Sequence, residues 1–188
     1  MHRRFRPHPG TATEADVVAA ARKGRLCELV DGVLVEKTRG YYESMLAGLP
    51  IYFLHEYQET DPLGIVLAPD GMTRIEPGLI RMPDVSFHAW EHFPNRLLPA
   101  GAFLERAPDL AVEILSPTNT EKEMDRKRGV YFSGGTTLVW QVYPPERRVR
   151  VYTSVDAFVE LTEDDTVAGD PVLPGFTLSI RRWFERAG

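Results

Sequence analysis

Residues 109–117 read Asp-Leu-Ala-Val-Glu-Ile-Leu-Ser-Pro, an apolar run that Glu113 alone interrupts between positions 110 and 115. A short apolar run without polar alternation is typical of a strand that is covered on both faces. The residues after it, 120–132, have the character of a helix that Gly134-Gly135 ends. Such a strand needs packed layers on both sides. We therefore expect an α/β protein, a sandwich built around a mixed central sheet flanked by helices.

The other segments fit the same architecture. Asp31-Gly32 predicts a tight hairpin turn, Pro50 predicts a kink or two shorter helices, and Pro83 predicts an edge or bulge position. We expect helices over 13–21, 41–57 and after Ser179, and strands over 26–30, 33–36, 63–67, 79–89, 110–115, 137–143, 148–153 and 157–161.

Length and composition limit the class of protein. The 188 residues suit a single domain over 1–188. Cys27 is the only cysteine, which excludes an internal disulfide and fits a reducing cytoplasm. No stretch reaches the roughly 18 consecutive apolar residues of a membrane helix, so we expect no membrane partner. Residues 1–10 are basic but lack the apolar segment of a secretory signal, and we expect a flexible arm there.

The net charge of −5 argues against a protein coated in nucleic acid, because phosphate binding favours lysine and arginine. It does not exclude a nuclease. Acidic residues gathered at a metal site become favourable once the cation is present.

Two carboxylates are candidates for such a site. Glu113 lies within an apolar strand, where a carboxylate needs a cation, a proton or a hydrogen-bonding partner. Asp84, in Met-Pro-Asp-Val, precedes another apolar segment and could lie at the same end of the sheet. Such a pair suits a hard dication, Mg²⁺ or Mn²⁺. The alternatives are a Glu113 that is exposed or paired with arginine, and an Asp84 in an ordinary turn.

Lys127 is the third candidate. It lies on the helix that follows the Glu113 strand, and a helix that returns along the sheet can aim one lysine over the strand end. An ammonium there could hold the attacking water or stabilise charge on a phosphate. The alternative is a solvated helix face. Its neighbours Arg126 and Arg128 are expected at the surface.

Two competing signals are weaker. His88 and His92 have the i, i+4 spacing of a helical zinc site, but Ala89 stands where the metalloprotease pattern has glutamate, and surface histidines are favoured. Ser116 follows a strand without a G-x-S-x-G elbow, and we expect it to bond the backbone at the strand exit.

Taken in order, these segments resemble the Uma2 family of bacterial endonucleases, a branch of the PD-(D/E)XK nuclease superfamily. The resemblance covers nearly the whole chain. Its matching pieces are Glu28-Leu-Val-Asp-Gly-Val-Leu-Val35, Met82-Pro-Asp-Val-Ser-Phe87, Val112-Glu-Ile-Leu-Ser-Pro117, Lys127-x-x-x-Tyr131, Val139-Trp-Gln-Val-Tyr-Pro144 and Arg148-Val-Arg-Val-Tyr152.

The resemblance implies a restriction-endonuclease-like fold, a mixed central sheet flanked by helices, and metal-dependent hydrolysis of a phosphodiester. It implies Asp84 and Glu113 as metal ligands and Glu28 as an extra ligand or orienting group. If the protein is an endonuclease, we expect the Ile114 carbonyl as a third ligand. The superfamily's motif lysine would fall at residue 115, which is leucine, so Lys127 is the residue that matches.

The chain departs from the family pattern in two places. Tyr42-Glu43 stands where relatives often carry a histidine, which leaves the contribution of that helix open. Gly134-Gly135-Thr-Thr replaces a more usual Gly-Val pattern, which matters less.

Two function hypotheses follow: a Mg²⁺-dependent endonuclease of DNA, or a nucleic-acid-binding or structural module that keeps the nuclease fold without turnover. Cutting both strands of a duplex needs two sites, so we expect a homodimer with DNA as its partner. Its basic residues should gather on the face of the site, namely Arg126, Arg128, Arg147, Arg148 and Arg150.

Overall fold

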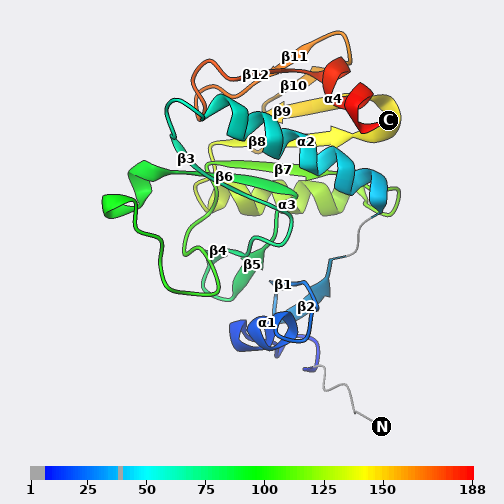
Figure 1. Ribbon diagram of the computed structural model, residues 1–188. Coiled ribbons are helices and arrows are strands. Elements are labelled where there is room, and N and C mark those ends of the chain that lie inside the picture. Colours follow the sequence, from blue (N-terminus) through cyan, green and yellow to red (C-terminus); the bar gives the residue numbers. More distant parts are fainter. Residues whose placement is uncertain (1–6, 38–39) are drawn as a thin grey trace.

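The computed structural model describes residues 7–37 and 40–188 (Figure 1). The chain is an α/β protein with a mixed central sheet flanked by helices, as the sequence predicts. Its helices are α1 (Glu14–Ala21), α2 (Tyr41–Tyr57), α3 (Glu121–Ser133) and α4 (Ile180–Ala187), with short 3₁₀ segments η1 (Trp90–His92), η2 (Pro94–Arg96) and η3 (Pro144–Glu146). Its strands are β1 (Cys27–Val30), β2 (Val33–Glu36), β3 (Gly64–Leu67), β4 (Thr73–Glu76), β5 (Leu79–Arg81), β6 (Val85–Ala89), β7 (Leu110–Ile114), β8 (Leu138–Tyr143), β9 (Arg148–Tyr152), β10 (Phe158–Leu161), β11 (Thr166–Ala168) and β12 (Thr177–Ser179).

The central sheet has six strands in the order β10-β9-β8-β7-β6-β3. Its two middle strands, β7 and β8, run parallel, with Glu113 opposite Gln141, and every other neighbouring pair is antiparallel. A parallel pair needs a crossover, which α3 supplies. The apolar run around Glu113 is therefore the central strand β7, buried along its whole length.

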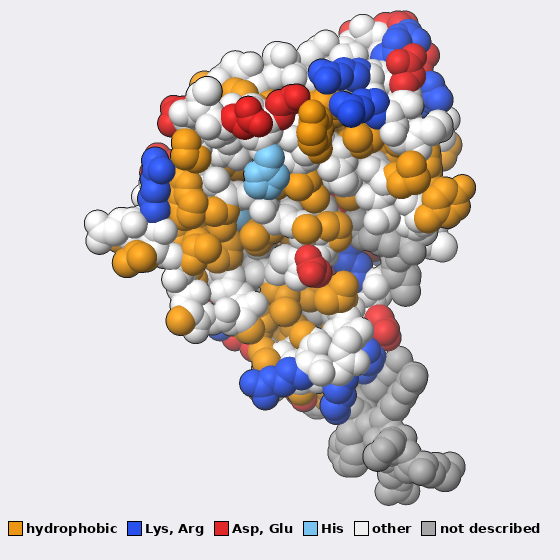
Figure 2. Space-filling model, in the orientation of Figure 1, with side chains coloured by type: hydrophobic (Ala, Val, Ile, Leu, Met, Phe, Trp, Pro, Cys, Tyr) orange, Lys and Arg blue, Asp and Glu red, His pale blue; other side chains and the backbone are white. Residues whose placement is uncertain are grey.

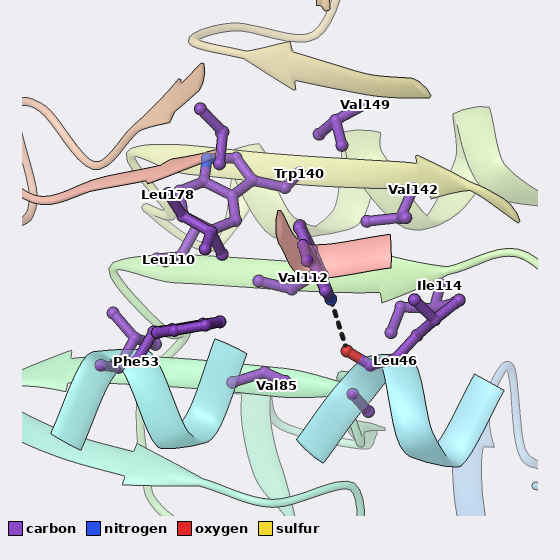
Figure 3. Close-up of a cluster of buried hydrophobic side chains, with 14 of the residues drawn as sticks. Leu46, Phe53, Val85, Leu110, Val112, Ile114, Trp140, Val142, Val149 and Leu178 are labelled. Atoms are coloured by element: carbon purple, nitrogen blue, oxygen red, sulfur yellow. Dashed lines mark hydrogen bonds between the residues drawn. The ribbon is translucent and has the colours of Figure 1, made fainter. Parts of the chain in front are cut away.

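The main core covers one face of this sheet. Leu110, Val112 and Ile114 of β7 point to that face, where α2, α4 and the β11-β12 hairpin pack against them (Figures 1 and 3). The Trp183 indole of α4 donates a 2.9 Å hydrogen bond to the Leu46 carbonyl of α2, the dashed line in Figure 3. Alternation along the strand sends Ala111 and Glu113 to the opposite face.

The opposite face packs against α3 and a second, four-stranded antiparallel sheet. That sheet has the order β2-β1-β5-β4 and lies with α1 at the N-terminal end of the molecule (Figure 1). Tyr131 of α3 joins Ala111 and Val139 there, together with apolar residues of the small sheet. Glu113 thus faces a junction of the central sheet, α3 and the small sheet.

The hairpin of the small sheet depends on its turn residues. Asp31 and Gly32 both have positive φ, +49° and +67°, as a two-residue hairpin turn of this type requires. A Cβ on Gly32 would lie 2.5 Å from the Gly10 carbonyl carbon, so the close approach of the N-terminal segment also requires glycine there.

Some elements differ from expectation. The extended segment 79–89 is two strands in different sheets, β5 and β6, because the chain crosses from one sheet to the other at 82–84. The segment 41–57 is one continuous helix that includes Pro50. Strands β4, β11 and β12 were not predicted.

The expectation for the N-terminal arm can be compared with the structure only in part. Of the arm expected over 1–10, residues 1–6 lie outside the described residues, and Thr11 closes a turn onto the His8 carbonyl. No helix in the described part of the chain is long and apolar enough to cross a membrane.

Candidate functional site

A cavity of about 200 Å³ lies at the junction that Glu113 faces. All five residues that the sequence analysis named as site residues line it: Glu113 and Ile114 from β7, and the others from β1, the crossing between the sheets, and α3. Its lining residues are Glu28, Val35, Glu36, Lys37, Glu43, Asp84, Glu113, Ile114, Ser116, Thr118, Asn119, Glu123 and Lys127.

Asp84 enters the cavity from the crossing between the two sheets. Its backbone N–H donates to the Val112 carbonyl at 2.9 Å, and the Ile114 N–H donates to its Oδ2 at 2.8 Å. Both partners belong to β7, so the neighbouring strand fixes the carboxylate beside Ile114. Its other oxygen, Oδ1, lies 2.8 Å from the ammonium of Lys37.

Glu113 is held from the helix layer. Lys127 Nζ lies 3.2 Å from Oε2, and the Tyr131 hydroxyl donates to Oε1 at 2.5 Å. Lys127 and Tyr131 are four residues apart on α3 and therefore lie on one helix face. The helix that follows the strand thus brings a lysine to Glu113, at a site where residue 115 is leucine.

Glu28 closes the site from the small sheet. Arg81 of β5 lies 2.8 Å from its Oε2, and the Met82 N–H donates to its Oε1 at 3.0 Å. Lys127 Nζ lies 3.9 Å from the same Oε1, so this lysine stands between Glu28 and Glu113. Each of the three buried carboxylates therefore has one cationic side chain of the protein within 3.2 Å.

The charges perturb one another. Burial acts to raise the pKa of Glu113, but Lys127, Lys37 and the Tyr131 hydrogen bond outweigh it, and the pKa is lowered. Burial likewise opposes the charge of Lys127, yet Glu113 and Glu28 raise its pKa. Burial and the neighbouring carboxylates raise the pKa of Tyr131. At neutral pH the site contains an ionised carboxylate, an ammonium and a neutral phenol.

This arrangement agrees with the result of comparing the whole chain with known proteins. The sequence model of the Uma2 family, described as "Putative restriction endonuclease", matches residues 15–181. The chain belongs to the Uma2 family. Among solved structures, a crystal structure described as a putative nuclease belonging to DUF820 from Anabaena variabilis ATCC 29413 has the same fold. It superposes with a TM-score of 0.76 at 18% identity, over 87% of this chain and 92% of that one. A search of curated proteins gives no match.

Three residues of this Uma2 chain were missed as site residues by sequence reasoning. Tyr131 could have been found, because its spacing from Lys127 places both on one helix face. Arg81 lies three residues before Asp84, but its contact with Glu28 depends on the pairing of β1 with β5. Lys37 follows β2, and nothing local to it indicates that it reaches Asp84.

Several expectations about neighbouring residues were wrong. Arg128 is buried, with its guanidinium 4.2 Å from the Tyr152 ring centre, because α3 packs this face against β9. His88 is also fully buried, since β6 lies inside the central sheet. The Ser116 hydroxyl bonds the side chains of Thr118 and Asn119 where backbone was expected, because the loop folds over it.

The chemical type of the oxygen donors at the cavity fits a hard cation. Asp84 and Glu113 supply carboxylate oxygens and Ile114 a carbonyl at the same cavity, and Mg²⁺ in proteins often has one or two carboxylates and several waters. Among the described residues no group of three His, Cys, Asp or Glu side chains is placed to hold a metal ion, and His88 and His92 form no zinc site there. The cavity would therefore supply few protein ligands.

The basic residues expected to gather around the site each contact an acidic or aromatic partner. Arg148 and Arg150 both pair with Glu160, and Arg126 pairs with Asp31. On the face shown in Figure 2, lysine and arginine side chains form separate small groups with acidic groups beside some of them and broad hydrophobic areas between. That face carries no continuous basic stripe.

Proposed function

We propose that this protein is a metal-dependent endonuclease that hydrolyses phosphodiester bonds of DNA with Mg²⁺ or Mn²⁺. The observation that carries the proposal is the position of Lys127. It reaches Glu113 from the following helix, 3.2 Å away, at the cavity that Asp84 enters from the neighbouring strand. Two carboxylates and one lysine around a small polar cavity are the groups that metal-assisted hydrolysis of a phosphodiester requires.

Asp84, Glu113 and the Ile114 carbonyl would hold the cation. A bound divalent cation lowers the pKa of water and offsets negative charge on the scissile phosphate. The rest of the chemistry belongs to the chain. The Ile114 N–H holds the Asp84 carboxylate in one orientation, and Tyr131 does the same for Glu113. Neither carboxylate has to reorganise when the substrate arrives.

Lys127 would orient the attacking water and stabilise the charge that develops on the phosphate. Glu28 would help to position this lysine, because its carboxylate lies 3.9 Å from Nζ. Arg81 in turn neutralises Glu28, which keeps a third buried carboxylate from destabilising the site.

The proposal includes a homodimer of this single domain, whose two sites would cut the two strands of one duplex. It also places the protein in the cytoplasm, where the single thiol of Cys27 stays reduced. Light scattering tests the dimer, and a monomer under cleavage conditions would remove the double-strand cut from the proposal.

Cleavage of mixed nucleic acids is the test. Supercoiled plasmid, linear duplex, single-stranded DNA and RNA are incubated with protein in Mg²⁺, Mn²⁺, Ca²⁺ or EDTA. We expect cleavage of DNA in Mg²⁺ or Mn²⁺ and none in EDTA. Asp84→Asn and Glu113→Gln should each lower the rate by about 10²-fold or more. Lys122→Met, which removes an exposed charge from α3, is the matched control and should cleave normally.

A second function has its own support. Each buried carboxylate of the site is already paired with a protein cation, and the chain carries a net charge of −5. These features suit a binding or structural module that keeps the nuclease fold without turnover. Salt-sensitive DNA binding by wild-type protein, with no cleavage of any substrate in any metal, would favour this second function.

A further inference from the structure

Lys37 makes a contact that the proposed roles of the other site residues leave unexplained. Its ammonium lies 2.8 Å from Asp84 Oδ1 and also donates to the Met82 carbonyl. A carboxylate oxygen and a backbone carbonyl are hard donors of the kind that bind Mg²⁺ and Ca²⁺. The ammonium thus has the surroundings of a bound cation, at the carboxylate that is the first proposed metal ligand.

The two lysines of the cavity are held differently. Lys127 extends from α3 between two buried carboxylates, Glu113 and Glu28. Lys37 extends from the end of β2, the edge strand of the small sheet, where its N–H donates to the Leu26 carbonyl. Its backbone is anchored there, while its long side chain reaches across the cavity to Asp84. Because Asp84 Oδ2 is held by Ile114, the ammonium can leave Oδ1 without releasing the carboxylate.

The charge of the cavity lining indicates under which conditions the Lys37 ammonium would leave Asp84. Glu36, Glu43 and Glu123 line the same cavity as the three buried carboxylates, so the lining is acidic. An acidic lining attracts a cation and repels a phosphodiester, and the phosphate becomes acceptable only after further positive charge has entered. A cation bound at Asp84 would also repel the Lys37 ammonium toward any anion in the cavity.

We propose that Lys37 has two roles, and this proposal rests on the nuclease function proposed above. It is an internal counter-ion of the metal-free site, and it becomes a catalytic residue when the site holds cation and substrate. In the free protein its ammonium occupies the cation position on Asp84. When cation and substrate are bound, it moves to a non-bridging oxygen of the scissile phosphate. There it stabilises the charge that develops during hydrolysis.

The first measurement is Mn²⁺ binding by the protein in the absence of DNA, monitored by titration calorimetry. Lys37→Met removes the competitor, so its dissociation constant for Mn²⁺ should fall about tenfold. Lys37→Arg keeps a cation at this position and should stay near wild type. Lys23→Met, which removes an exposed lysine, is the charge-matched control. Melting curves establish that each variant is folded, and Lys37→Gln, which also removes the charge and should likewise bind Mn²⁺ more tightly, replaces Lys37→Met if that variant does not fold.

The second measurement is cleavage at saturating Mn²⁺. Lys37→Met should cut about 10²-fold more slowly than wild type although it binds the metal more tightly. Metal affinity that is unchanged or weaker in Lys37→Met overturns the counter-ion role. A wild-type cleavage rate in Lys37→Met overturns the catalytic role. If wild-type protein cleaves nothing, the proposed function and the catalytic role both fail, and the calorimetry still decides the counter-ion role.

Discussion

Removing the charge of Lys127 should destabilise the metal-free protein strongly, although lysines on helices usually contribute little to stability. The reason is its position. The side chain is about one-tenth exposed, and its ammonium lies 3.2 Å from Glu113, which is buried inside the central strand. Lys127→Met keeps much of the side-chain volume, so the change that matters is a buried carboxylate left without its nearest cation.

The size of the effect follows from that environment. Removing one partner of a buried ion pair costs about 3–5 kcal/mol. Glu113 would keep the 2.5 Å hydrogen bond from Tyr131 and the attraction of Lys37, so the lower end applies, about 3 kcal/mol. For a chain of this size that corresponds to a Tm about 6–12 °C lower. Lys127→Met/Glu113→Gln should recover most of the loss, because no uncompensated charge remains.

Thermal and urea unfolding in EDTA measure the effect, with Lys122→Met on the exposed side of α3 as the control. The double variant separates charge from packing, since a packing defect at Lys127 would persist when Glu113 is replaced. A Lys127→Met protein that melts within about 1 °C of wild type would refute the reasoning. It would mean that the ammonium does not neutralise Glu113 in solution.

Three further outcomes are expected. Tyr131→Phe removes a hydrogen bond to an ionised group and should lower the free energy of unfolding by about 1.5–3 kcal/mol in urea titrations. Burial lowers the pKa of His88 from 6.5 to about 3. As pH falls through 6.5, the unfolded chain therefore binds a proton at His88 that the folded chain does not. Between pH 7 and pH 4.5 the wild type should lose about 2.5 kcal/mol of stability for this reason. A folded His88→Asn protein should not show this loss. A control change at exposed His55 should leave that slope intact. Finally, Ca²⁺ should tighten DNA binding by the same factor by which DNA tightens Ca²⁺ binding, measured by anisotropy and calorimetry, because the acidic cavity accepts a phosphate only with the cation.

The sequence predicts the central elements because their signals are local. The run around Glu113 is apolar on both faces and becomes the buried strand β7, and the helix after it is bounded by a capping threonine and two glycines. Asp84 and Glu113 could be proposed together because each is a carboxylate at an apolar strand. Lys127 could be proposed because the helix that follows the Glu113 strand returns along the sheet, and the resemblance to the family supports it, since residue 115 is leucine.

The remaining contacts are set by pairings between distant segments. Whether Arg81 faces Glu28 depends on the antiparallel pairing of β5 with β1 and on the chain leaving the small sheet after Arg81. His88 was expected at the surface because Ala89 stands where the metalloprotease pattern has glutamate, and the local sequence reveals nothing of the layers above β6. A register shift of one residue would reverse which side chains of either strand point inward, and the local sequence does not determine that register.

The net charge of −5 and a DNA substrate are compatible because the acidic residues at this site are distributed in two layers. The innermost carboxylates, Asp84, Glu113 and Glu28, are each neutralised by a side chain of the protein. The outer residues of the lining, among them Glu43 and Glu123, leave the entrance acidic. A duplex that approaches without a cation meets this entrance and is repelled, whereas a divalent cation is attracted to it. Under the proposed function, nucleic acid would therefore bind at the carboxylates only together with the metal, and without the cation such a cavity would hold DNA poorly.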